Sequence, residues 1–122
     1  MRIAELIGGP VAMCDPGTAI VDAARQMLAD GIGSLAVVAD HRLVGIVTER
    51  DVMRGFAEPE LGDRVEDIMT PNPDSLSPDV ETADAADWMM GAGYRHLPVV
   101  DGDRLVGMVS IKDLLWALTD RG

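Results

Sequence analysis

Aromatic residues are scarce in this chain of 122 residues, which contains two tryptophans, one tyrosine and one phenylalanine. Hydrophobic residues nevertheless make up 48% of the sequence, so a core must be built from aliphatic side chains and from the eight methionines. Such an apolar composition excludes an intrinsically disordered chain. The length is that of one ordinary domain with a modest core.

Cysteine is also nearly absent. Cys14 is the only one, so the chain cannot form an internal disulfide, and a reducing cytosol is the expected compartment. A lone cysteine is more often a small apolar filler than a redox sensor. Cys14 and two histidines offer no recognised spacing for zinc ligands, and no nucleophile has a base beside it in the sequence. We expect no metal, no cofactor and no catalysis.

Basic residues are outnumbered, with 10 Lys and Arg against 21 Asp and Glu and a net charge of −11. This field would repel nucleic acids and acidic membrane surfaces, so neither is expected as a partner. No apolar run approaches the ~20 residues of a membrane-spanning helix, and the first residues lack the features of a signal peptide. We expect a cytoplasmic protein in which a local basic group holds any anionic ligand.

What the sequence does contain is an internal repeat. Shifting the chain by 62 residues against itself gives 16 identities over the 53 positions from 2 to 54, without a gap. The longest match places Arg42–Gly45 on Arg104–Gly107, and a second places Asp22–Ala24 on Asp84–Ala86. This identity is several times what chance would give, so the chain is a duplication.

Each copy predicts the same order of elements: an apolar lead-in, a helix, two strands rich in β-branched residues, and a second helix. The lead-in is compatible with either a turn of helix or an edge strand. Gly31 and Gly93 follow the first helices, where a left-handed cap needs no Cβ. The predicted elements are Ile3–Ile7, Ile20–Leu28, Leu35–Val38, Leu43–Val47 and Asp51–Phe56, and in the second copy Val65–Met69, Thr82–Met90, Leu97–Val100, Leu105–Val109 and Lys112–Leu118.

This order predicts an α+β fold of two tandem βαββα-type repeats. Residues 1–57 form the first repeat, residues 58–63 a linker, and residues 64–122 the second repeat. Neither half can bury both faces of its sheet alone. We therefore expect the halves to pack on each other with pseudo-two-fold symmetry.

Four segments carry a resemblance to a known family: Gly45–Asp51, Asp67–Pro71, Gly93–Val100 and Gly107–Asp113. Their ordered occurrence at a fixed offset resembles a pair of cystathionine-β-synthase (CBS) domains, or Bateman module, over essentially the whole chain. The resemblance implies a non-catalytic module that binds an adenosine-containing ligand in the cleft between its repeats. The second copy is nearer the family pattern, since the first lead-in lacks a Met-Thr step.

The candidate binding residues are Thr48 with Asp51 and Ser110 with Asp113, each pair at the step from strand to helix. From the residues alone, this spacing is close to a capping box that serves stability. The resemblance implies instead that the hydroxyl contacts phosphate or ribose and that the carboxylate accepts hydrogen bonds from ribose hydroxyls. The two roles are compatible, because a helix N-terminus also favours a phosphate.

Arg95 and His96 open the first strand of the second copy, and the resemblance implies contacts with nucleotide phosphates. The alternative is a solvated start of the strand. The equivalent positions in the first copy are Gly33 and Ser34, which carry no charge. We therefore expect the second copy to provide most of the phosphate recognition.

Two functions remain open at this point. The first is a stand-alone regulatory module that senses AMP, ADP, ATP or S-adenosylmethionine and signals to an effector protein encoded elsewhere. The second is a dimeric interaction protein with no bound nucleotide. In either case we expect a homodimer, because apolar helical residues exceed the need of one small core. The residues expected to supply this surface are Ile20, Met27, Trp88, Met89 and Trp116.

Overall fold

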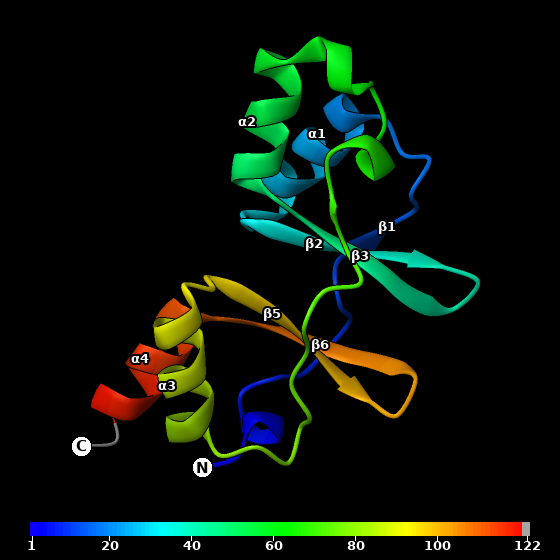
Figure 1. The fold of residues 1–122 in the computed structure, drawn as a ribbon. Helices are drawn as coiled ribbons and strands as arrows, with labels where there is room; N and C mark the ends of the chain where they lie inside the picture. Colours follow the sequence, from blue (N-terminus) through cyan, green and yellow to red (C-terminus); the bar gives the residue numbers. More distant parts are fainter. Residues whose placement is uncertain (121–122) are drawn as a thin grey trace. The chain divides into compact units, whose positions relative to one another are not determined.

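The computed structural model describes residues 1–120 and contains in each copy the predicted helix, hairpin and second helix (Figure 1). The lead-ins are short 3-10 turns, labelled η, so of their two predicted forms the helical turn is confirmed. In chain order the elements are η1 (Ile3–Glu5), β1 (Met13–Cys14), α1 (Ile20–Asp30), β2 (Ser34–Ala39), β3 (Arg42–Thr48), α2 (Glu49–Ala57), η2 (Pro59–Leu61), η3 (Val65–Asp67), β4 (Thr70–Pro71), α3 (Thr82–Ala92), β5 (His96–Asp101), β6 (Arg104–Ser110) and α4 (Ile111–Asp120).

Local sequence signals fix where these elements end. Gly31 and Gly93 close α1 and α3 in the left-handed conformation, with φ of 64° and 78°, as predicted. Asp40 and His41 form the β2–β3 turn, and both have positive φ, of 51° and 65°. A two-residue turn of this handedness matches the twist of the strands that it joins.

The two sheets differ in extent. The first has the strand order β1-β2-β3-β4, and the second has only β5-β6. β1 pairs in parallel with β2, and β4 pairs antiparallel with β3. The predicted βαββα-type order includes a strand before the first helix of each repeat, and β1 and β4 occupy these two places. The residues that form them were not predicted, because two residues are too few to show an alternating pattern.

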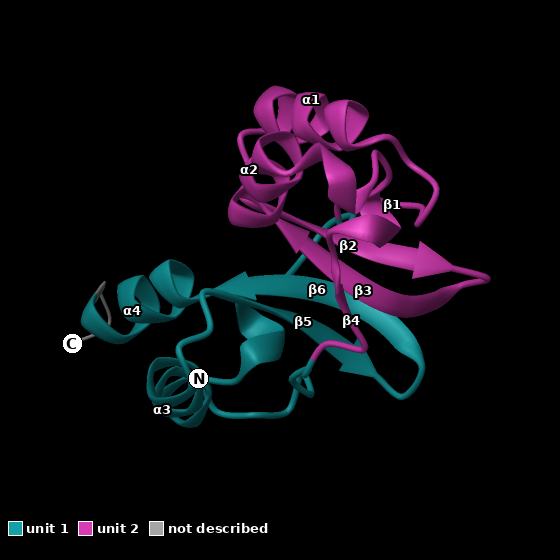
Figure 2. Cartoon of the chain, turned by 45° about the horizontal axis from the view of Figure 1, so that its top comes forward, with its two compact units in different colours: residues 1–11, 74–122 teal, residues 12–73 magenta. Residues whose placement is uncertain are grey.

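The chain forms two compact units that do not coincide with its repeats (Figure 2). Unit 2 comprises Ala12–Pro73, and unit 1 combines Met1–Val11 with Asp74–Gly122. Each lead-in therefore belongs to the unit formed by the other repeat. The predicted boundaries at residues 57 and 64 separate the two sequence repeats. The boundaries between the two compact units lie instead after residues 11 and 73.

The same backbone hydrogen bonds dock both lead-ins. In unit 1, Ile3 N donates to Val80 O at 2.8 Å; in unit 2, Val65 N donates to Thr18 O at 2.8 Å. Two further bonds recur with the same offset of 62 residues, Ala4 to Pro78 with Glu66 to Pro16, and Thr82 to Met1 with Ile20 to Asp63. The duplication has thus preserved the docking of the lead-ins along with the repeats themselves.

Each unit has its own apolar core, and a lead-in residue completes it. Ile3 and Val65 are both fully buried. The core of unit 1 consists of Ile3, Leu76, Ala85, Ala86, Met89, Leu97, Val99, Val109 and Leu114. The core of unit 2 consists of Ile20, Ala23, Met27, Leu35, Val37, Val47, Val52, Val65 and Ile68.

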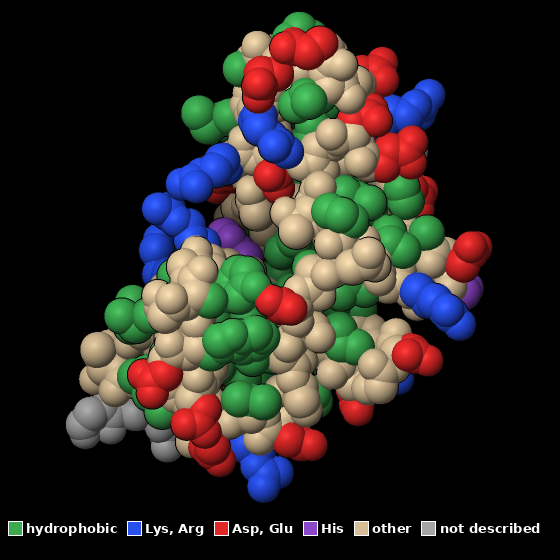
Figure 3. Space-filling view, in the orientation of Figure 1, with side chains coloured by type: hydrophobic (Ala, Val, Ile, Leu, Met, Phe, Trp, Pro, Cys, Tyr) green, Lys and Arg blue, Asp and Glu red, His purple; other side chains and the backbone are tan. Residues whose placement is uncertain are grey.

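The helices expose many apolar side chains, but not all of those predicted. Ile20, Met27 and Met89 are buried in the cores, so their assignment to a dimer surface was wrong. The apolar spacing of Ile20, Ala23, Ala24, Met27 and Leu28 predicts that these residues share one face of α1, but Leu28 is 83% exposed. Figure 3 shows hydrophobic side chains at the surface between scattered acidic ones. The exposed large apolar residues are Met13, Val21, Leu28, Met53, Phe56, Leu61, Trp88, Met90, Leu115, Trp116 and Leu118.

Two equivalent glycines, Gly45 and Gly107, let the lead-ins approach the second strand of each hairpin. A Cβ on Gly45 would lie 2.5 Å from Met69 Sδ and 3.0 Å from the carbonyl oxygen of Thr70. A Cβ on Gly107 would lie 2.7 Å from Ile7 Cγ2 and 2.9 Å from Ile7 Cβ. The glycine is therefore required in both copies by the packing of the lead-in.

We predict that Gly107→Ala lowers the free energy of unfolding by about 1–3 kcal/mol, because the new methyl group overlaps Ile7 close to the backbone. Urea denaturation measures this change. Gly91→Ala is the control, since a Cβ there meets nothing within 4 Å inside α3, and should raise the same free energy by about 0.5–1 kcal/mol. Equal stability of the two variants would contradict the packing argument.

We also predict a homodimer, because the helices expose large apolar side chains that a second copy of the chain would cover. Light scattering at micromolar concentration should return about twice the chain mass of 13.0 kDa. Trp116→Glu removes one of the largest exposed apolar side chains and should shift the equilibrium toward the monomer. A mass of one chain for the unsubstituted protein would refute the dimer.

Candidate functional site

The first candidate pair lies where β3 passes into α2. Thr48 has extended backbone and is the N-cap of α2, and its Oγ1 accepts a hydrogen bond from Asp51 N at 3.3 Å. Asp51 Oδ2 accepts hydrogen bonds from Thr48 N at 2.9 Å and from Thr48 Oγ1 at 3.1 Å. The predicted capping box is confirmed, and Asp51 is half-buried within it.

The second pair lies at the equivalent step from β6 into α4. Asp113 N donates to Ser110 Oγ at 3.0 Å, and Ser110 N donates to Asp113 Oδ2 at 3.3 Å. Asp113 is exposed, unlike Asp51. This cap is more open than the first, and its carboxylate lies at the surface.

The start of β5 brings Arg95 and His96 to the same end of unit 1. His96 is the register partner of Ser110, and Ile111 N donates to Arg95 O at 2.8 Å. Arg95 is exposed, as is Lys112 in the first turn of α4. Four of the six predicted site residues, Arg95, His96, Ser110 and Asp113, therefore gather at one end of the β5–β6 hairpin.

Unit 2 has the same backbone arrangement without the charges. Ser34 is the register partner of Thr48, and Glu49 N donates to Gly33 O at 3.1 Å. Ser34 is buried, so its side chain is not offered to solvent. Thr48 and Asp51 thus lie together, but the neighbouring strand start in unit 2 provides no cation.

A polar contact that sequence reasoning missed lies next to Arg95. The Tyr94 hydroxyl donates to Asp74 Oδ2, and the Tyr94 ring meets Trp88 edge-on with centroids 5.8 Å apart. This hydrogen bond is the main cause that raises the pKa of Tyr94, so the phenol stays protonated at neutral pH. Because Asp74 and Tyr94 are 20 residues apart, no sequence motif could have joined them.

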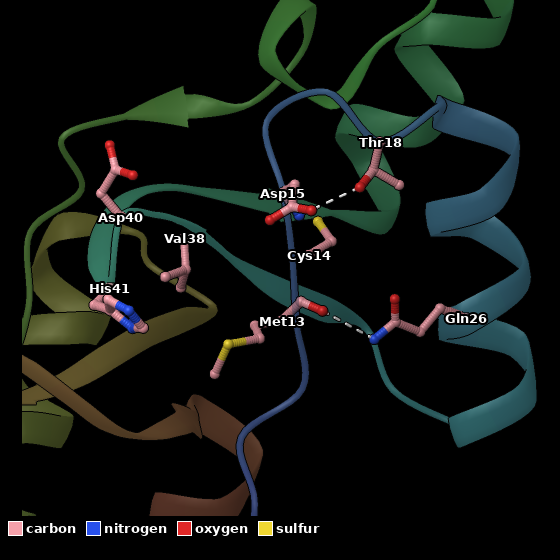
Figure 4. A pocket seen from close by; sticks show the side chains of 8 residues that line it. All are labelled: Met13, Cys14, Asp15, Thr18, Gln26, Val38, Asp40 and His41. Atoms are coloured by element: carbon pink, nitrogen blue, oxygen red, sulfur yellow. Dashed lines mark hydrogen bonds between the residues drawn. The ribbon is translucent and has the colours of Figure 1, made fainter.

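A hollow of about 610 Å³ lies elsewhere in unit 2, along the edge strand β1 (Figure 4). Gln26 closes part of that edge by donating from Nε2 to Met13 O at 3.2 Å. None of the six predicted site residues lines it. The lining residues are Met13, Cys14, Asp15, Thr18, Gln26, Val38, Asp40 and His41.

Cys14 in this hollow is a poor nucleophile. Burial raises the pKa of its thiol to about 11, and the neighbouring Asp15 carboxylate adds to the rise. The thiolate, which is the reactive form, is then almost absent at neutral pH. Within residues 1–120 no group of three or more His, Cys, Asp or Glu side chains is placed to hold a metal ion. In the same part of the chain, no helix has the length and apolarity to cross a membrane.

The fold and the paired junctions define a class of protein: a duplicated α+β unit with a hydroxyl–carboxylate pair at each step from strand to helix. The family model described as CBS domain matches residues 3–58 and again residues 65–120. The chain therefore belongs to the CBS-domain family and consists of two tandem CBS repeats. The predicted family and fold class are confirmed.

Relatives and solved structures agree with this assignment. An uncharacterized 17.7 kDa protein of Acidianus ambivalens is 36% identical over 121 residues, which cover 98% of this chain and 74% of the relative. The CBS domain pair of protein MJ0100, solved with 5-methylthioadenosine and S-adenosyl-L-methionine, is 25% identical with a TM-score of 0.92 and covers 100% of this chain and 98% of its own. CBSX2, solved with AMP, is 24% identical with a TM-score of 0.85, covers 98% and 97% of the two chains, and supports the fold alone.

Other curated relatives are much longer proteins. The chain spans 30%, 24% and 23% of the length of three of them. CBS pairs thus occur within larger proteins as well as in small ones.

We predict that iodoacetamide alkylates Cys14 in the folded protein at neutral pH about 100-fold more slowly than a thiol with the ordinary pKa of 9.0, because the thiolate fraction falls by that factor. Rates measured from pH 7 to pH 10 check this. The same measurement in urea is the control and should show ordinary reactivity. Asp15→Asn should speed the reaction, since it removes a charge that raises the pKa.

Proposed function

We propose that this protein is a regulatory module that binds an adenosine-containing ligand in unit 1. The observation that carries the proposal is the gathering of Arg95, His96, Ser110 and Asp113 at one end of the β5–β6 hairpin. The class of ligand follows from the MJ0100 domain pair, whose structure holds 5-methylthioadenosine and S-adenosyl-L-methionine. AMP, ADP and ATP share the adenosyl group and add phosphate.

Each residue has a role that suits its chemistry. The Asp113 carboxylate is an acceptor with room for two donors, as a ribose diol requires. Arg95 carries a permanent charge in a planar fork that matches phosphate oxygens. The Ser110 hydroxyl and the first turn of α4 add donors where the helix dipole favours an anion. Such local positive groups are needed because the chain as a whole carries −11.

The proposed mechanism needs no bond to be made or broken, and we propose no enzymatic activity. A ligand that binds one conformation of the pair better than another shifts the population toward it. An effector protein that binds one of these conformations in preference would respond to this change in population. The size of the response is limited by the difference in ligand affinity between the two conformations.

A second candidate function is favoured by the exposed apolar residues. Phe56 and Met53 on α2 and Trp116 on α4 are all more than half exposed. They suit an interaction protein that dimerises or binds a partner without any nucleotide. Calorimetric titration with AMP, ATP, adenosine and S-adenosylmethionine separates the two functions, because the second gives no heat of binding with any of them.

We predict that AMP binds more tightly than adenosine and that Arg95→Ala removes this preference. Loss of a charge-assisted contact of ~1.5–3 kcal/mol corresponds to a loss of AMP affinity of about ten- to a hundredfold. Adenosine affinity should hardly change. Arg104→Ala is the matched control, since Arg104 is an exposed arginine at the other end of β6.

Equal affinity of the unsubstituted protein for AMP and adenosine would exclude a phosphate role for Arg95. The preferred ligand would then be one whose adenosyl group carries no phosphate, such as S-adenosylmethionine. Loss of AMP affinity in Arg104→Ala as large as in Arg95→Ala would attribute the effect to net charge alone.

A further inference from the structure

The two carboxylates at the strand-to-helix steps are not equally available. Asp51 Oδ2 already accepts two hydrogen bonds from Thr48, and the Asp51 side chain is 16% exposed. Among the described residues, Asp113 accepts one hydrogen bond, from Ser110 N at 3.3 Å, and it lies in the open. The hydroxyl proton of Thr48 is given to Asp51, whereas that of Ser110 has no acceptor within residues 1–120.

A cation faces the remaining oxygen of Asp51. Arg54, one turn along α2, places Nη2 at 4.0 Å from Asp51 Oδ1. The same nitrogen donates to the carbonyl oxygen of Ile68 at 3.0 Å. Arg54 is therefore held on one side by the lead-in of unit 2 and lies beside the carboxylate on the other.

The second copy has no such cation. The residue 62 positions after Arg54 is Trp116, which is uncharged and 62% exposed. Lys112 lies beside Asp113 in the first turn of α4, but within residues 1–120 no basic side chain forms an ion pair with Asp113. The two copies differ at the position that decides whether the carboxylate is free.

These differences affect what each pair can bind. A ribose diol needs free lone pairs on a carboxylate, and both oxygens of Asp51 already face donors. A ligand at Asp51 would have to displace the Arg54 guanidinium, which the Ile68 carbonyl holds in place. Within residues 1–120, Asp113 Oδ1 accepts no hydrogen bond and forms no ion pair, and the Ser110 hydroxyl remains able to donate to a ligand.

We propose that the chain binds one adenosyl ligand, at Asp113 in unit 1, and that Arg54 keeps the Thr48–Asp51 pair closed to a second. Arg54 is then a specificity-determining residue: the junction occurs in both copies, but only the copy without this arginine binds the ligand. This inference rests on the proposed function, since it concerns how many of the paired junctions take the ligand.

The test uses AMP as the probe and calorimetry with the full chain. The expected stoichiometry is one AMP per chain, with amide shifts at Ser110 and Asp113 and none at Thr48 and Asp51 in nitrogen–proton spectra. Asp113→Ala should abolish this binding, and Asp51→Ala should leave it within about twofold. With adenosine as the probe, because the strand start in unit 2 provides no cation for a phosphate, Arg54→Met should raise the stoichiometry from one to two and move the Thr48 and Asp51 amides. Arg25→Met, on α1, is the control with the same change of net charge and should stay at one.

The reciprocal substitution, which adds an arginine to the second copy, tests the inference even if Arg54→Met fails to fold. Trp116→Arg introduces the guanidinium one turn after Asp113 at an exposed position. It should weaken AMP binding about tenfold, although the added positive charge by itself favours an anion. Leu115→Arg adds the same charge on another side of α4 and should not weaken binding.

Four results overturn the inference. Two equivalent AMP molecules per unsubstituted chain would do so while leaving the proposed function intact. Unchanged stoichiometry in a folded Arg54→Met chain would remove the role of Arg54, as would undiminished AMP affinity in Trp116→Arg. Absence of binding by every adenosyl compound of the panel would instead defeat the proposed function, and the inference with it.

Discussion

The exchange of lead-ins between the two units is the constraint on which the rest of the structure depends. Ile3 and Val65 are fully buried in cores whose other members come from the opposite repeat. The backbone hydrogen bonds that dock them are the same in both units. Gly45 and Gly107 are glycines because the lead-ins pass too close for a side chain. The hairpins, which carry the candidate residues at their ends, are therefore held from one side by a segment distant in sequence.

On this shared framework the two copies have diverged in their polar residues. Both keep the hydroxyl–carboxylate cap at the second helix, because a cap stabilises the helix whether or not a ligand binds. Only the second adds Arg95 and His96, and only the first adds Arg54 beside its carboxylate. A duplication thus maintained the fold in both halves while charge was redistributed at a few exposed positions.

The sequence was sufficient to predict the repeat, the family, the helices and the hairpins, because each rests on local periodicity or turn chemistry. It also predicted the cap at Thr48. It could not show which residues form the edge strands β1 and β4, which are two residues long and depend on a partner strand. Nor could it show that Leu28 is exposed while Ile20 is buried, since both lie within the apolar stripe of one helix. The Arg54–Ile68 hydrogen bond was equally hidden, because it joins α2 to a segment beyond the linker.

Because residues 1–11 pack with the second repeat, damage to the N-terminus destabilises a part of the fold that is distant in sequence. Fraying or proteolytic nicking of η1 would withdraw Ile3 from the core of unit 1, where Leu97, Val109 and Leu114 support the β5–β6 hairpin and α4. The loss of stability would thus appear near Ser110 and Asp113, more than a hundred residues downstream, whereas the core of unit 2 would stay complete. The stability of the last helix, α4, therefore depends on the first turn of the chain, η1.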